Sequence, residues 1–329
     1  FIGPLVKLSL PLPAGAAMPT SGVIPEPVYG DQLQTQSIAL AHQLRTSSLS
    51  VMAAAGDVVP EAYPVLFWQD DVFRYPDGSE VTLRRPQLDL SDLGYGPLHA
   101  DTLISLRNAP PIHGSGLLAL IAGADLEALA DPDDANGDGI SGRFNRVMDP
   151  LTGQWVAGRF GLKANRPNLE TTVAAAFAND VGISNPLFPQ QPCTSVQSAC
   201  LQQRNGNNAE GFELPAHLLQ LVIDFTRNLG VPMRRNPSAA DVQAGEVLFM
   251  ASGCQQCHQP SYVTQASNEP PHLGQQTIWP YTDLLLHDMG PALADGRPDF
   301  DASGSEWRTP PLWGIGLSQS VNGSSNFLH

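Results

Sequence analysis

The residues best suited to chemistry are Cys254, Cys257 and His258, which form a Cys-x-x-Cys-His motif. Thiols at this spacing lie on one helical turn and can add across the two vinyl groups of a haem, with the adjacent histidine beneath the iron as proximal ligand. A redox-active Cys-x-x-Cys would need a βαβ context, and a zinc site would need a second ligand pair. The sequence shows neither, so the motif predicts covalently bound haem c.

The ligand on the other side of the iron is less well defined by the sequence. His287 and Met289, in the downstream string PYTDLLLHDMG, are candidates for a distal iron ligand, and His272 and His329 are further ones. A distal methionine raises the reduction potential of a haem. Met289 could equally be ordinary core packing, and His287 could bond a haem propionate, so these alternatives stay open.

A second candidate site is the acidic string DPDDANGDGISG. Asp134, Asn136 and Asp138, followed by Gly139, match the first half of an EF-hand loop, whose alternating oxygen ligands suit Ca²⁺. The match fails at position twelve, where Asn145 replaces the bidentate glutamate. A modified calcium loop and a solvated Asx-rich turn are both consistent with this pattern.

The remaining two cysteines, Cys193 and Cys200, lie in the loop string CTSVQSAC. A disulfide closing this short loop is expected if the protein matures in an oxidising compartment, and two free thiols are the alternative. No histidine or further cysteine is close in sequence, which makes a metal site at this pair a weaker interpretation.

The charge balance limits the possible partners. The chain of 329 residues has 17 basic and 32 acidic side chains, a formal net charge of -15. This argues against binding nucleic acid or an anionic membrane, and it permits a basic redox partner. No run of 18 apolar residues occurs, which predicts that there is no transmembrane segment. The first residues do not fit a signal peptide, and we expect the chain to be processed or truncated.

The elements that position these residues follow from apolar periodicity and turn signals. A small antiparallel β element is expected within 36–90, where LRTSSLSV and SEVTLRRPQL alternate and YPDG marks a turn. Helical spacing predicts helices over 114–130, over 168–181 with Asn168 as N-cap, over 214–230, and over 238–253 with Ser238 as a possible cap. The last of these leads directly into the Cys-x-x-Cys-His motif.

These strings also resemble a known family. PVYGDQLQ, SLRNAPPIHGSGLL, DDANGDGISGRFN, GRFGLKAN, PYTDLLLHDMG and EWRTPPLWGIGL, placed around GCQQCH, resemble the bacterial di-haem oxidoreductases, also named thiol oxidoreductases. These are distant relatives of di-haem cytochrome c peroxidases and of the methylamine-utilisation di-haem enzymes. Members usually carry two haem motifs, and only one is present here. We therefore expect one haem in this chain and two in a longer full-length protein; a natural mono-haem variant is the alternative.

The resemblance implies further roles for residues. It suggests that the acidic loop is calcium-like and lies near the haem domain, and that Arg308 and Thr309, in the string RTPPL, lie near the haem. Arg308 would then contact a propionate, with a surface salt bridge as the alternative. The aromatic residues Trp307 and Trp313 are either electron-relay groups or core packing. Arg107 and His113 could face a second haem.

The expected fold is a mainly α cytochrome c-like haem domain with long loops, plus the small β element in the N-terminal half. Two domains are expected. Residues 1–235 would hold the wrapping segment, β element, acidic loop and helices, and residues 236–329 would form the haem domain. The expected function is that of a periplasmic or secreted peroxidase-like haem oxidoreductase that receives electrons from a small cytochrome or similar donor. The alternative is a non-catalytic electron-transfer or assembly subunit of a larger complex.

Overall fold

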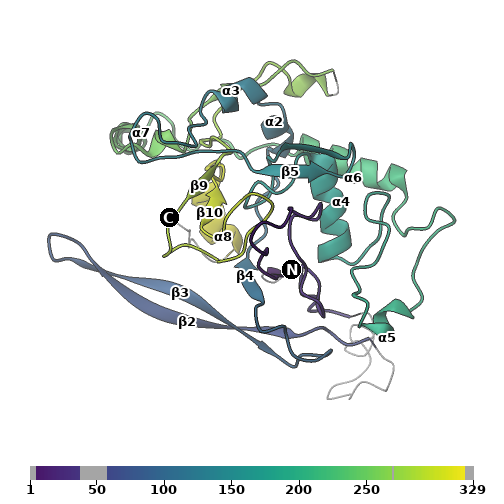
Figure 1. Cartoon of the computed structure of the whole chain (residues 1–329). Coiled ribbons are helices and arrows are strands. Elements are labelled where there is room, and N and C mark those ends of the chain that lie inside the picture. The colour runs from purple at the N-terminus through teal and green to yellow at the C-terminus, as the bar shows by residue number, and fades with distance from the viewer. Residues whose placement is uncertain (1–4, 38–57, 269, 323–329) are drawn as a thin grey trace. The chain divides into compact units, whose positions relative to one another are not determined.

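The strands of this chain form separate two-stranded antiparallel pairs rather than one large sheet (Figure 1). They are seen in a computed structural model that describes residues 5–37, 58–268 and 270–322. By spatial contacts the chain divides into two compact units. Unit 1 comprises Phe1–Pro11, Ile24–Ala109 and Gln191–Gly206, and unit 2 comprises Leu12–Val23, Pro110–Gln190 and Asn207–His329. The domain boundary expected at residue 236 stays a prediction.

The core of unit 1 forms around the pair β1 (Leu5–Ser9) and β4 (Leu103–Arg107). Successive side chains of a strand point to opposite faces, so Val6 and Leu8 are buried together. They pack with Tyr29, Leu33 and Ala62, which the wrapping N-terminal segment and the start of the hairpin supply. A short helix, α5 (Ser198–Leu201), belongs to the same unit.

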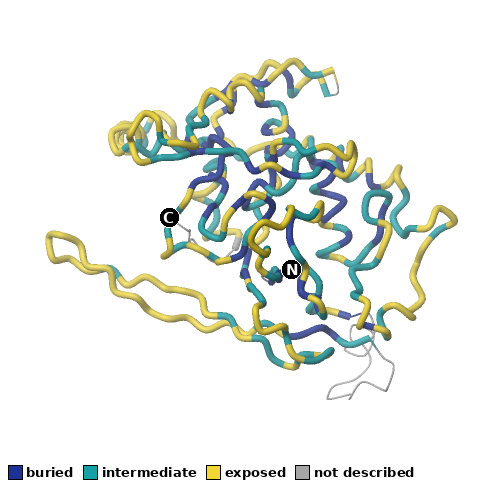
Figure 2. Tube along the Cα trace, in the orientation of Figure 1, coloured by how far each residue is buried: buried dark blue, intermediate teal, exposed yellow. Residues whose placement is uncertain are grey.

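Unit 1 also contains a long β-hairpin, β2 (Tyr63–Arg74) and β3 (Glu80–Ser91), paired from Tyr63↔Ser91 to Arg74↔Glu80. The turn expected at YPDG is confirmed, since the Tyr75 amide donates to the Ser79 carbonyl over 2.8 Å. Figure 2 shows both strands exposed along most of their length. The guanidinium of Arg84 lies 4.9 Å from the Trp68 ring centroid, which gives this exposed ribbon a cation–π contact.

Unit 2 is built on two helices that sequence periodicity predicted correctly. Helix α4 (Leu169–Asp180) begins at the expected cap, because the Asn168 side chain accepts the Thr171 amide over 2.9 Å. Helix α6 (Ala216–Asn228) packs on it through an apolar cluster of Val173, Ala174, Leu219 and Ile223.

Apart from helix α7, the other elements of unit 2 are short. The helix expected over 114–130 divides into α2 (Ser115–Ala119) and α3 (Gly123–Glu127), and α8 spans Ser318–Asn322. Helix α7 (Ala240–Ala251) forms as expected, but its N-cap is Ala239, not Ser238. The strand pairs are β5 (Arg146–Asp149) with β6 (Gln154–Ala157), β7 (Tyr262–Val263) with β8 (Thr277–Ile278), and β9 (Leu286–Asp288) with β10 (Glu306–Arg308). Three 3₁₀ turns span Cys254–Gln256 (η1), Pro271–Leu273 (η2) and Ile315–Leu317 (η3).

The expectation of a mainly α cytochrome c-like fold is wrong. Helix and strand each account for 22% of the structure, and the sheets are small and antiparallel. The 30 glycines and 30 prolines of the chain interrupt helices and favour turns, which explains the short elements and long connections. Within the part of the chain that the structure describes, no helix combines the length and apolar character that crossing a bilayer requires.

Candidate haem site

The Cys-x-x-Cys-His motif lies directly after helix α7. Gly253 has a left-handed backbone (φ 77) that turns the chain into η1, where the amide of His258 donates to the carbonyl of Cys254 over 2.9 Å. Neither Cys254 nor Cys257 is in a disulfide, and both are partly exposed. The two thiols and the histidine are therefore on one tight turn, as the sequence predicts.

The imidazole of His258 is buried and bonds a main-chain acceptor. Its Nδ1 lies 2.8 Å from the carbonyl oxygen of Tyr281. A carbonyl only accepts hydrogen bonds, so Nδ1 must carry the proton, and in the neutral ring Nε2 then carries the lone pair. Histidines that bind metals through one ring nitrogen characteristically donate a hydrogen bond from the N–H of the other. This tautomer fits a proximal iron ligand.

The carbonyl of Tyr281 belongs to a segment that runs alongside the motif, and we call residues 281–283 the strap. The Thr282 amide donates to the Gln259 carbonyl and the Asp283 amide donates to the Cys257 carbonyl, each over 3.0 Å. Tyr281 has a left-handed backbone (φ 53), which is uncommon for a residue with a side chain. The strap therefore fixes the motif through its main chain.

Beyond the strap, Asp283 and His287 form a buried pair beside one of the two thiols. The Nε2 of His287 lies 2.7 Å from Oδ2 of Asp283, and its Nδ1 lies 3.8 Å from Sγ of Cys257. Burial alone lowers the pKa of His287, but the contacts with Asp283 and Cys257 outweigh it and raise the pKa to about 10. A haem thioether at Cys257 would remove the thiol's share of this effect and leave that of Asp283.

Apolar side chains lie next to the motif. No residue of α7 is buried, and its Val247 and Leu248 are 68% and 65% exposed although the helix ends only three residues before Cys254. Phe249 points its ring toward His258 and Tyr281, with ring centroids 6.2 and 5.5 Å away. An apolar surface beside a pair of unbonded thiols fits a large apolar group attached at this point.

Arg308 is buried in β10. Its Nε donates to the carbonyl of Gly161 over 2.7 Å and its Nη1 to the carbonyl of Thr309 over 3.2 Å. Burial lowers its pKa to about 10, and the nearby Asp283 acts in the opposite direction. These contacts are to main chain, so the alternative of a surface salt bridge does not describe it, and a propionate contact stays a prediction.

The acidic loop uses its side chains to organise its own turn. Both carboxylate oxygens of Asp134 lie 3.2 Å from the Gly139 amide, and Oδ1 of Asn136 accepts the Asp138 amide over 2.9 Å. Among the described residues, no group of three or more His, Cys, Asp or Glu is placed to hold a metal ion. Oδ2 of Asp138 instead accepts a hydrogen bond from Gln256 of the Cys-x-x-Cys-His motif over 3.0 Å. The calcium site stays a prediction.

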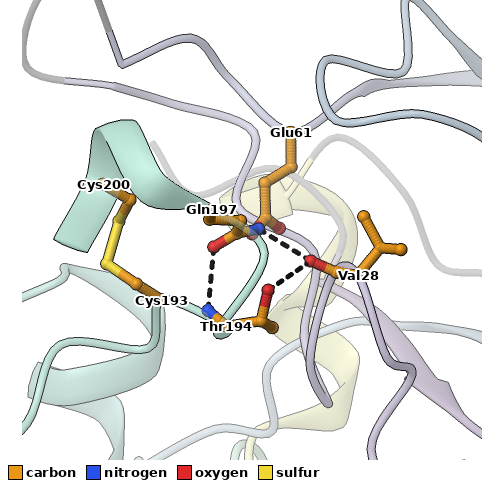
Figure 3. The surroundings of a disulfide bond; sticks show 6 residues. All are labelled: Val28, Glu61, Cys193, Thr194, Gln197 and Cys200. Carbon is orange, nitrogen blue, oxygen red and sulfur yellow. Dashed lines mark hydrogen bonds between the residues drawn. A yellow bond between two sulfur atoms is a disulfide. The ribbon is translucent and has the colours of Figure 1, made fainter. Parts of the chain in front are cut away.

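The expected disulfide is present in unit 1 and supports a polar network (Figure 3). Inside the loop that Cys193 and Cys200 close, the Thr194 hydroxyl and the Gln197 amide both donate to the Val28 carbonyl, over 2.8 and 3.0 Å. Gln197 also donates to Glu61 over 2.5 Å. Burial raises the pKa of Glu61 to about 7 despite this bond.

The other candidates are dispersed. Met289 is half-buried just after β9, with its amide donating to the Ser305 carbonyl over 3.0 Å, and His272 is exposed in η2. His329 lies outside the described residues. The Trp307 indole donates to the Leu293 carbonyl, with the Lys163 ammonium 4.4 Å from its ring centroid, and Trp313 packs partly buried against the core.

Two further candidates face local partners. Arg107, in β4 of unit 1, donates to the Ser105 hydroxyl over 2.8 Å. Nε2 of His113 in unit 2 lies 3.2 Å from the Trp313 carbonyl. Sequence reasoning missed the contacts of Tyr281 and Asp283 with the motif, and the contact of Gln256 with the acidic loop. Only the spacing of Asp283 and His287, four residues apart, was available as a signal for their pairing.

Comparison with known proteins identifies a family for this chain. A family model described as "Di-haem oxidoreductase, putative peroxidase" matches residues 21–329, which include the whole site. No curated protein and no solved structure matches the chain.

Proposed function

Because the chain belongs to the di-haem oxidoreductase family, we propose that it is a haem c oxidoreductase of the peroxidase type, with one haem held by residues 254–258. The observation that carries this proposal is the hydrogen bond from Nδ1 of His258 to the Tyr281 carbonyl. It places the ring in the tautomer that binds iron through Nε2, and it does so beside two thiols that are not paired with each other.

In this proposal each residue of the motif has one role. Cys254 and Cys257 form thioethers, and His258 is the proximal ligand. The bound haem supplies one-electron transfer. The strap holds the His258 ring in a single orientation, and a neutral main-chain acceptor makes the ring less basic than a carboxylate acceptor would.

For the distal position we favour Met289 over His287. Both ring nitrogens of His287 already have partners, since Nε2 bonds Asp283 and Nδ1 faces the Cys257 sulfur. Met289 follows two residues later and its side chain is half-buried. A methionine ligand would give a high-potential haem suited to receiving electrons, so peroxide would react at a second haem of the full-length protein.

The setting of the reaction is also part of the proposal. The disulfide Cys193–Cys200 supports a periplasmic or secreted location, because such bonds persist in oxidising compartments. The net charge of -15 favours a basic electron donor, such as a small cytochrome. No second haem motif lies within the 329 residues, so a second haem would need a further segment of chain.

The test uses the full-length protein produced together with a cytochrome c maturation system. Covalent haem is counted by pyridine haemochrome and intact mass, and the reduced protein is then mixed with hydrogen peroxide and a reduced small cytochrome. We expect covalent haem that is lost in Cys254→Ala/Cys257→Ala, and oxidation of the small cytochrome that depends on peroxide. Absence of covalent haem would contradict the haem c assignment. Covalent haem that never responds to peroxide would favour the non-catalytic electron-transfer subunit.

A further inference from the structure

The two thiols of the motif have different surroundings. Sγ of Cys257 faces Nδ1 of His287 at 3.8 Å, and the far side of that ring is tied to Asp283 at 2.7 Å. Within the described part of the chain, the thiol of Cys254 has no hydrogen-bond partner and no ion pair. A cysteine, a histidine and a carboxylate in this order form the arrangement that activates a thiol toward carbon in other proteins.

The side chains of Asp283 and His287 are also held rigidly. The other carboxylate oxygen of Asp283 accepts the Leu285 amide over 3.0 Å, and the Asp283 amide donates to the Cys257 carbonyl over 3.0 Å. On the open side of the ring, Gly142 approaches so closely that a Cβ there would lie 2.9 Å from Cε1 of His287. His287 is buried, so the ring has little freedom to turn from the sulfur.

We propose that Asp283 and His287 form a built-in device for haem attachment, in which the His287 ring holds the proton given up by the Cys257 thiol, so that Sγ can bond to a vinyl group of haem. Asp283 is the positioning residue that keeps Nδ1 directed at the sulfur. Attachment at Cys254 proceeds without such help. This inference rests on the proposed function only in assuming that haem is bound covalently at the motif.

The chemistry balances without a further reactant. The S–H bond of Cys257 and the π bond of the vinyl group are broken, and an S–C bond forms at the vinyl carbon nearer the porphyrin. The terminal vinyl carbon receives one proton, which becomes part of a methyl group. This proton is the one that Cys257 has given up to His287, so no proton is gained or lost overall. The addition involves no net oxidation or reduction.

Single-cysteine backgrounds isolate each thioether. In a Cys254→Ala protein all covalent haem depends on Cys257, whereas in a Cys257→Ala protein it depends on Cys254. We expect His287→Ala to lower covalent haem at least about tenfold in the first background and to leave it unchanged in the second, since a proton-transfer group typically contributes more than that in rate. Covalent haem is measured by haem stain on denaturing gels and by intact mass.

Further variants separate proton transfer from packing. His287→Gln can hold a hydrogen bond but cannot relay a proton, so we expect it to behave like His287→Ala, and Asp283→Asn should give an intermediate yield. His217→Ala, an exposed histidine on α6, is the matched control. In the protein with both cysteines, His287→Ala should give the one-thioether haemochrome spectrum of Cys257→Ala, which tests the same step if Cys254→Ala alone attaches little haem.

The outcomes are distinguishable. An equal loss of haem in both single-cysteine backgrounds, or full attachment with His287→Gln, would overturn the role of His287 in proton transfer. Two intact thioethers in the His287→Ala protein would overturn it as well. If the unmodified protein binds no covalent haem, the proposed function fails first, and this inference fails with it.

Discussion

The α-carbon of Gly142 faces the imidazole of His287, and a Cβ at this position would lie 2.9 Å from Cε1 of the ring and 3.1 Å from Cδ1 of Leu285. Because Leu285 and His287 are both buried, neither side chain can move away without an energetic cost. We expect Gly142→Ala to destabilise the protein by about 1–3 kcal/mol and to turn His287 away from Cys257. Thermal unfolding and the haemochrome spectrum measure the two effects.

The control for this change is Gly123→Ala. A Cβ at Gly123 meets nothing within 4 Å, and the residue begins helix α3, so alanine should be neutral or slightly stabilising. Equal melting temperatures for the two alanine variants would contradict the packing of Gly142 on His287.

Replacement of His258 should separate iron ligation from covalent attachment. His258→Gln keeps both thiols, so we expect haem to remain covalently bound while its visible spectrum and spin state change. The loss of peroxide-dependent turnover should exceed the 10–100-fold that changes around a metal ligand usually cause. His272→Gln, an exposed histidine in η2, is the control and should keep the parent spectrum. An unchanged spectrum for His258→Gln would show that another residue binds the iron.

Glu61 makes the stability of the protein depend on pH. Burial raises its pKa from 4.5 to about 7. A carboxylic acid that binds its proton more tightly in the folded state stabilises the protein while it is protonated, and this stabilisation decreases as the pH rises from the unfolded pKa to the folded pKa. Its contribution is complete below pH 4.5 and is lost as the pH rises to about 7, a change of up to about 3 kcal/mol.

The measurement is the melting temperature between pH 4.5 and 8. We expect a fall with rising pH that Glu61→Gln reduces and that Glu210→Gln, at an exposed position, leaves in place. If Glu61→Gln shows the same slope as the parent protein, the pH dependence has another source.

Removal of the disulfide should loosen unit 1 while leaving the haem motif intact. The Cys193–Cys200 bond closes a loop with a sequence separation of 7, for which chain entropy predicts a contribution of about 2.5 kcal/mol. The same loop places Thr194 and Gln197 on the Val28 carbonyl, so some of this network should weaken too. Denaturant unfolding of Cys193→Ser/Cys200→Ser, followed by fluorescence, measures the loss, and an unchanged haem content is the control. An unfolding midpoint equal to that of the parent would show that the bond adds no stability.

Local sequence signals predicted local structure well. Asn168 marked the start of α4, apolar periodicity marked α6 and α7, and the Cys-x-x-Cys-His motif is on one turn as its spacing indicates. The fold class was wrong because strands as short as two residues, such as Tyr262–Val263, carry almost no periodic pattern. Residues 114–130 show continuous helical spacing, yet the helix stops at Ala119, where Arg159 from a distant segment donates to the carbonyls of Leu118 and Ile121.

The surroundings of the motif were less accessible to sequence reasoning. The hydrogen-bond acceptor for His258 is a main-chain carbonyl 23 residues away. Every residue has such a carbonyl, so the residue type at 281 does not identify it as the acceptor. The ring of His287 was a candidate iron ligand by its residue type alone. Its contacts with Asp283 and Cys257 depend on the fold around β9, which contains His287, and the sequence does not show them.

The strap has a consequence for how this site can change over evolutionary time. The three hydrogen bonds between the strap and residues 257–259 use main-chain groups of the strap, so a substitution at Tyr281 that preserves the path of the backbone leaves the orientation of His258 untouched. At residue 281, selection must preserve a left-handed backbone conformation rather than a particular side chain. Homologues with a different side chain at residue 281 therefore keep the same proximal geometry if this backbone conformation is kept.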